Sequence, residues 1–152
     1  MHYAASFGFV PLIQRMYQVY NEVILTVDNL SNTPLHTASV NGQLECALAL
    51  IILADGLLQM KDSFNCTFLH AAAYSGQDAF ISGLFTSQEF DGNMHAKILK
   101  LLQDQDCNGR TPLLCAAASG SKASVKVLEE FGSNIFSVDY VSLIGGNTGS
   151  DF

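Results

Sequence analysis

The sequence has little of what several functional classes require. It contains no tryptophan, three prolines, and seven lysines and arginines against fourteen acidic residues, so its net charge at pH 7 is -7. Binding to a nucleic-acid backbone needs clustered Lys and Arg, so a nucleic-acid partner is disfavoured. Only 14% of the 152 residues are charged and 49% are hydrophobic, which is too apolar for a disordered chain. We expect one folded domain.

Membrane and secretory signals are also missing. The longest uncharged apolar run, from Cys46 to Ala54, is much shorter than the roughly 20 residues that cross a bilayer. No basic segment followed by an apolar core opens the chain, as in a secretory signal. The four cysteines form neither a CxxC pair nor a compact disulfide spacing. We therefore expect no membrane span in this chain, reduced thiols and a cytoplasmic location.

Signatures of catalysis and metal binding are lacking as well. The sequence contains neither a nucleophile elbow nor a glycine-rich phosphate loop. Cys66 and His70 are four residues apart, but two further ligands at tetrahedral spacing do not accompany them. We expect no enzymatic activity, no cofactor and no metal.

What the sequence does contain is an internal repeat. The segment "NTPLHTASVNGQLE" at 32–45 returns as "CTFLHAAAYSGQDA" at 66–79 and as "RTPLLCAAASGSKA" at 110–123. The first residues, "MHYAASFGFV", match the same motif without its first positions. The aligned positions are His2, His36, His70 and Leu114.

A second landmark recurs with the same period. Asp28, Asp62 and Asp106 each lie five residues before the threonine of the repeated phrase. A period near 33 residues around T-P-L-H-x-A is typical of ankyrin repeats, and the chain resembles that family over nearly its full length. A generic antiparallel helical bundle is the alternative, but it requires neither Thr-Pro before its helices nor Asp at a fixed offset.

Each repeated position has a physical role. Thr33 is a natural N-cap, Pro34 lacks an N–H that would be unpaired in the first turn, and His36 is placed to reach back to the cap. Glycines that adopt the left-handed conformation are expected to end the first helices, at Gly42, Gly76 and Gly120. Second helices are predicted over Leu44 to Leu53, Asp78 to Phe85 and Ala123 to Phe131. Gly56 and Gly132 are expected to end two of them.

The predicted fold is therefore all-α: an ankyrin-repeat solenoid of stacked helix-turn-helix units with an insertion in the third unit. The array is predicted over 1–141, followed at 142–152 by a glycine-rich tail or truncated repeat. Its units are a partial repeat at 1–26, then 27–60, 61–104, 105–137 and the start of a further repeat at 138–141. The first and last units lack parts of the repeat, which predicts a piece of a longer array.

The insertion is visible as extra length in the third unit. From Gly76 to Asp106 there are 30 residues, against 19 from Gly120 to Asp139. The insert is placed near 86–103, as a loop at 86–95 followed by an amphipathic helix over about 95–103. It is either a tolerated loop or a projection that contacts part of a larger assembly.

One ordering of motifs is more particular. "KDSFNCTFLH" has Phe-Leu-His in place of Pro-Leu-His, and it is followed by the long insert and then by "DQDCNGRTPL". Over about 61–137 this resembles the mid-array region of transient receptor potential channels of the ankyrin subfamily. The resemblance implies a cytosolic part of a tetrameric, calcium-permeable cation channel that responds to chemical or thermal stimuli. The alternative is an ankyrin scaffold or adaptor segment of a soluble signalling protein.

Binding to a protein partner, or to neighbouring repeats of a longer chain, is the expected function. Variable positions on the turns and first helices face a partner in such arrays, while the constant ones hold the stack. The partner-binding candidates are Leu30, Thr37, Asn41, Phe64, Tyr74, Ser75, Asn108 and Arg110. The two aromatics are either anchors for a partner or contacts with the adjoining repeat. Cys107, in a turn, is the candidate reactive thiol, the alternative being an ordinary surface cysteine.

Overall fold

A computed structural model gives the structure of the protein and describes residues 1–132. This part of the chain is built from α-helices joined by short 3-10 helices and loops, without strands. The α-helices are α1 (His2–Phe7), α2 (Val10–Val19), α3 (Pro34–Val40), α4 (Leu44–Leu53), α5 (Phe68–Tyr74), α6 (Asp78–Thr86), α7 (Gly92–Lys100), α8 (Pro112–Ala118) and α9 (Lys122–Glu130). The 3-10 helices are η1 (Asn21–Leu25), η2 (Asp55–Gln59) and η3 (Leu101–Gln103). The predicted repeat start at 138–141 and the tail at 142–152 lie outside the described residues.

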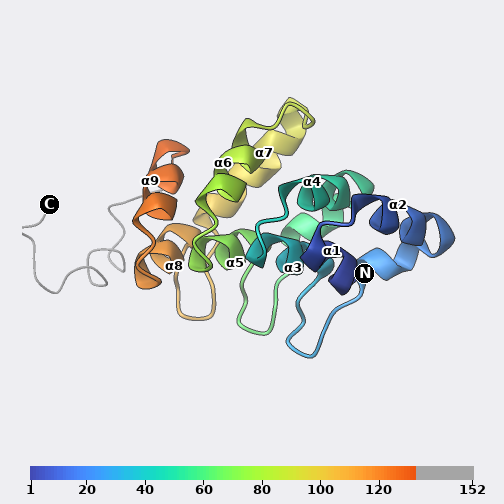
Figure 1. Ribbon diagram of the computed structural model, residues 1–152. Helices are drawn as coiled ribbons and strands as arrows, with labels where there is room; N and C mark the ends of the chain where they lie inside the picture. The colour runs from blue at the N-terminus through green and yellow to red at the C-terminus, as the bar shows by residue number, and fades with distance from the viewer. Residues whose placement is uncertain (133–152) are drawn as a thin grey trace, which may run out of the picture.

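The helices stack sideways in two rows (Figure 1). The first helix of each pair contacts the first helix of the next, so that α1, α3, α5 and α8 form one row, and α2, α4, α6 and α9 form the other. Three turn loops, residues 26–33, 60–67 and 104–111, project from the row of first helices (Figure 1). The buried side chains form one core that runs between the rows. Stacked helical pairs of this kind define a solenoid, as the sequence predicts.

The first helices begin at the predicted caps. Thr33 accepts a hydrogen bond from the backbone N–H of His36, and the ring of His36 accepts one from the backbone N–H of Thr33. Thr67 and His70 form the same reciprocal pair. This capping box satisfies two backbone donors that the first turn of a helix leaves free. Thr111 caps α8 in the same way, but Leu114 has no ring nitrogen to complete the box.

The ends of the elements are mostly where the repeat places them. Gly42, Gly76 and Gly120 have φ of 68°, 70° and 78°, the left-handed conformation expected after a first helix. The prediction for Gly56 is wrong, because α4 already ends at Leu53 and Gly56 lies inside η2. Helix α9 starts at Lys122, one residue earlier than predicted, because the side chain of Ser121 caps it.

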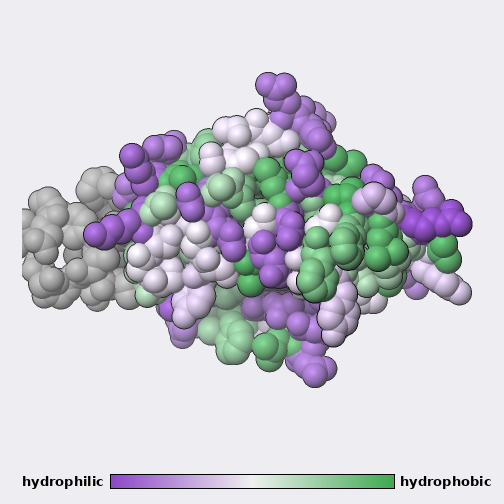
Figure 2. Space-filling model, in the orientation of Figure 1, coloured by the Kyte–Doolittle hydropathy of each residue, from purple (hydrophilic) through white to green (hydrophobic). Residues whose placement is uncertain are grey.

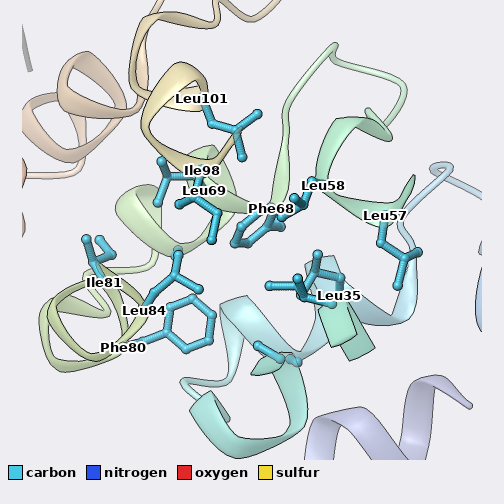
Figure 3. Close-up of a cluster of buried hydrophobic side chains, with 14 of the residues drawn as sticks. Leu35, Leu57, Leu58, Phe68, Leu69, Phe80, Ile81, Leu84, Ile98 and Leu101 are labelled. Atoms are coloured by element: carbon cyan, nitrogen blue, oxygen red, sulfur yellow. The ribbon is translucent and has the colours of Figure 1, made fainter. Parts of the chain in front are cut away.

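The insertion is more ordered than the sequence indicates. The loop predicted over 86–95 spans only 87–91, because Asp91 accepts a hydrogen bond from the backbone N–H of Met94 and starts α7 at Gly92. Ile98 and Leu101 are buried in the same cluster as Phe68 and Leu69 (Figure 3). The insert is therefore part of the core, although the tips of α6 and α7 rise above the neighbouring helices (Figure 1).

Candidate functional site

Side-chain bonds between successive units hold the turn loops in register. The Nε2 atoms of His2, His36 and His70 lie 2.8, 2.9 and 2.8 Å from the carbonyl oxygens of Asn32, Cys66 and Arg110. Each of these carbonyls belongs to the residue just before the capping threonine of the next unit. A carbonyl only accepts, so each Nε2 must carry the proton. Each histidine thus links its own helix to the following turn loop.

The histidines of the two boxes are held in the neutral form. His36 and His70 are buried, and this burial is the largest cause that lowers their pKa below the usual 6.5. Their Nδ1 atoms already accept a backbone N–H, so a proton there would break the capping box. These histidines are structural, and their protonation is opposed by both burial and geometry.

A second set of bonds lies at the other end of the first helices. Gln43 donates from Nε2 to the carbonyl of Ser6 at 3.1 Å, and Gln77 donates to the carbonyl of Val40 at 2.8 Å. Neither glutamine is among the residues predicted from the sequence, although the Gly-Gln pair repeats at 42–43 and 76–77.

The turn loops are stiffened by their aspartates and by each other. In the middle loop, Oδ1 of Asp62 accepts hydrogen bonds from the backbone N–H groups of Phe64 and Cys66, at 2.8 and 2.9 Å. The backbone N–H of Cys107 donates to the carbonyl of Phe64 at 2.9 Å, which joins the middle loop to the third. Ser31 and Asn65 have φ of 62° where the third loop has Gly109 at 76°, so all three loops make the same turn. A rigid, repeated turn is a suitable support for a binding surface.

A groove of about 380 Å³ lies between the turn loops and the first helices. Its walls come from three consecutive units. The lining residues are Asn32, Val40, Asp62, Phe64, Cys66, His70, Ala71, Tyr74, Ser75, Asp106, Cys107, Asn108, Arg110 and Cys115. Phe64 and Tyr74 are 55% and 59% exposed. More than half of each residue's surface is therefore open to a partner, and the rest is covered by the protein.

The groove gathers most of the predicted site residues. Phe64, Tyr74, Ser75, Asn108, Arg110 and the candidate thiol Cys107 all line it. Leu30, Thr37 and Asn41 lie outside it. Thr37 donates from its hydroxyl to the carbonyl of Thr33 at 3.4 Å, and Asn41 donates from Nδ2 to the carbonyl of Thr37 at 2.8 Å.

Two further groove residues are not among those predicted from the sequence, although the repeat indicates them. Asn32 and Cys66 occupy the same repeat position as Arg110, immediately before the capping threonine, and all three line the groove. The signal for Asn32 and Cys66 is therefore their alignment with Arg110 in the repeat.

The two carboxylates in the groove differ in whether they have a salt-bridge partner. Asp106 is almost fully buried and its Oδ2 accepts a hydrogen bond from Nε of Arg110 at 3.1 Å. Burial alone would raise the pKa of Asp106, but hydrogen bonds from Arg110 and Asn108 outweigh it and lower the pKa. Asp62 has no salt bridge among the described residues.

The groove thiols differ in accessibility. Burial is the main cause that raises the pKa of Cys66 and Cys115 to about 12, whereas Cys107 is exposed at the rim. Asp62 and Asp106 add to the rise in the pKa of Cys66, because a negative charge disfavours the thiolate. Within residues 1–132, no three His, Cys, Asp or Glu side chains are grouped to hold a metal. No helix in this part of the chain combines the length and the apolar character needed to cross a membrane.

The stacked helical pairs, the histidine bonds and the groove define a repeat protein of the solenoid class. The family description "Ankyrin repeats (3 copies)" matches residues 1–94 and 57–139. The chain belongs to the ankyrin-repeat family. Arrays of this family are non-catalytic modules for protein–protein interaction.

The relatives that the chain matches are different types of protein. The chain is 37% identical over 79 residues to "Transient receptor potential cation channel subfamily A member 1 homolog" of Caenorhabditis elegans, which covers 52% of this chain and 6% of the relative. It is 25% identical over 134 residues to "Putative E3 ubiquitin-protein ligase XBAT31" of Arabidopsis thaliana, covering 88% of this chain and 29% of the relative. It is also 25% identical over 137 residues to "Synphilin-1" of Mus musculus, covering 89% and 14%. The chain thus spans less than a third of each of these relatives.

Proposed function

We propose that the groove between the turn loops and the first helices is the docking site for a segment of a partner protein. The observation that carries the proposal is the pair of exposed aromatics, Phe64 on a turn loop and Tyr74 on α5, which line one groove. Large aromatics supply most of the binding energy at interfaces because they bury much area at small entropic cost. Ser75, Asn108 and Arg110 add hydrogen-bonding groups beside them. Leu30, Thr37 and Asn41 extend the same face beyond the groove.

Site-specific photocrosslinking in cells tests this assignment. A benzophenone amino acid replaces Tyr74 in one variant and Ile52 in a matched control, because Ile52 is a similarly exposed apolar residue on α4. We expect a crosslinked protein partner from position 74 and none from position 52. Equal crosslinking from both positions, or crosslinking from position 52 alone, would contradict a docking site in the groove.

For the whole protein, we propose that this chain is a piece of the cytosolic ankyrin array of a transient receptor potential ankyrin-type cation channel. The 37% identity to the channel homolog supports this, as do the Phe-Leu-His motif and the insert before a more regular repeat. The array would then lie on the cytosolic side of a membrane and take part in a tetramer.

The second candidate is an ankyrin scaffold or adaptor of a soluble signalling protein. It is favoured by the two relatives that align with most of the chain, neither of which is named as a channel. The full-length transcript distinguishes the candidates. Six apolar spans downstream of the repeats would establish a channel, and a kinase, death or ubiquitin-ligase module in their place would refute it.

A further inference from the structure

The groove carries one negative charge that no neighbouring side chain neutralises. Among its lining residues the formal charges are Asp62, Asp106 and Arg110, and the last two pair with each other. Asp62 uses Oδ1 for its own turn, while Oδ2 accepts no hydrogen bond from the described residues. Lys61, next in the chain, forms no ion pair with it. His70 adds no positive charge, because its Nδ1 already accepts the N–H of Thr67.

This carboxylate lies beside the apolar part of the groove. Phe64 is two residues away on the same turn, and its backbone N–H donates to Oδ1 of Asp62, so the carboxylate and the backbone that carries the exposed ring are held close together. Tyr74, Ala71 and Val40 complete the apolar lining. A cation that reaches Asp62 is therefore delivered next to a place for a large apolar side chain.

Arg110 offers a different contact. Its Nε donates to Asp106, which leaves its terminal nitrogens without a hydrogen-bond partner among residues 1–132. Because the pair is already neutral, these nitrogens suit an uncharged acceptor better than a second carboxylate. A backbone carbonyl of an extended segment is such an acceptor.

We propose that the groove selects an extended protein segment in which a lysine or arginine lies close to a bulky apolar residue. The cation pairs with Oδ2 of Asp62, the apolar side chain packs against Phe64 and Tyr74, and a backbone carbonyl accepts from Arg110. This inference rests on the proposed docking function and specifies the chemistry of the partner. The overall charge of -7 favours the approach of such a segment.

Selection from random dodecapeptides displayed on phage, with the purified chain as bait, tests the inference. We expect the selected peptides to share a basic residue within a few positions of an aromatic or a large aliphatic residue. Their affinity should fall about tenfold or more in Asp62→Asn, since a charge-assisted hydrogen bond is lost. Replacing the peptide's basic residue by Gln should cost the same in the unchanged protein and nothing further in Asp62→Asn.

The control is Asp28→Asn, which changes the equivalent aspartate of the first turn loop. Asp28 bonds the N–H groups of Leu30 and Asn32 as Asp62 bonds those of its own loop, but it lies outside the groove. Asparagine keeps the Oδ1 acceptor, so both variants should fold, as circular dichroism can verify. Asp28→Asn should bind the peptides as the unchanged chain does.

Four results would overturn the inference. Peptides that lose affinity on Tyr74→Ser but not on Asp62→Asn would place binding in the groove without the charge, leaving the docking function intact. Equal losses in Asp28→Asn and Asp62→Asn would show an effect of turn structure only. If Tyr74→Ser leaves the affinity of the peptides unchanged, or if the selection yields no enriched binders, both the docking function and the inference are rejected.

Discussion

At the scale of single residues, the two boxed histidines make stability depend on pH. His36 and His70 have pKa values lowered in the folded state, so folding favours their neutral form. Their contribution is complete above the unfolded-state pKa of about 6.5 and is lost as pH falls from there toward the folded-state pKa. We expect the free energy of unfolding, from urea titrations, to be smaller at pH 5.5 than at pH 7.5.

The variant His36→Leu isolates one of these contributions. It removes the partner of the Thr33 N–H and the Cys66 carbonyl, and should cost about 1 to 3 kcal/mol at pH 7.5. It should also reduce the pH dependence, because one of the two groups with a lowered pKa is gone. A variant that keeps the full pH dependence of the unchanged chain would contradict this account.

The cysteines allow a second residue-scale prediction. Cys66 and Cys115, with pKa near 12, carry little thiolate at neutral pH, and Cys46 is buried, while Cys107 is exposed. Ellman's reagent should therefore titrate one thiol rapidly in the native protein at pH 7.5. Cys107→Ser should abolish that rapid phase and Cys66→Ser should keep it. A rapid phase that survives Cys107→Ser would refute the assignment.

At the scale of elements, the insert should stabilise the array. Ile98 on α7 is fully buried and its neighbour Leu99 is 45% exposed, so two adjacent truncations provide a matched pair. Ile98→Ala should lower the free energy of unfolding by about 2 to 4 kcal/mol and speed proteolysis within 86–103, because it leaves a cavity beneath the helix. Leu99→Ala should cost less than about 1 kcal/mol. Urea titration and limited proteolysis of the two variants measure these effects. Equally small losses of stability in Ile98→Ala and Leu99→Ala would show that the insert does not stabilise the array.

The elements also show why parts of the repeat were predictable and the insert was less so. Thr33 and Gly42 act on backbone groups within a few residues, so their effect is readable in the local sequence. The Asp-Gly-Asn sequence at 91–93 is typical of a turn, and here Asp91 instead caps α7 and Gly92 starts it. What keeps α7 in place is burial against Phe68 and Leu69, which no local pattern contains.

At the scale of the whole molecule, the α1 end of the solenoid should promote self-association. Phe7 and Phe9 are exposed there with stacked rings 6.0 Å apart, and apolar residues cover much of the surface near α1 and α2 (Figure 2). Repeats depend on neighbours to bury such faces. Sedimentation velocity should therefore show larger species as the concentration rises. Phe7→Lys should reduce them, Leu99→Lys on the distant insert should not, and a monomer at every concentration would contradict the prediction.

The candidate site was predictable to the extent that the repeat exposes it. Phe64 and Tyr74 stand at variable positions of a regular pattern, so the sequence could nominate them. The hydrogen bond from the Thr37 side chain to the Thr33 carbonyl was not predictable in the same way, because it depends on a rotamer that the repeat pattern does not specify.

The repeat, its caps and its left-handed turns are encoded locally, because each rests on interactions between residues a few positions apart. The burial of the thiols, the carbonyls that the histidines and glutamines bond, and the groove formed by three units all depend on how the units stack. Those outcomes join residues about 30 to 40 positions apart, and only the stacking of the units brings such residues into contact.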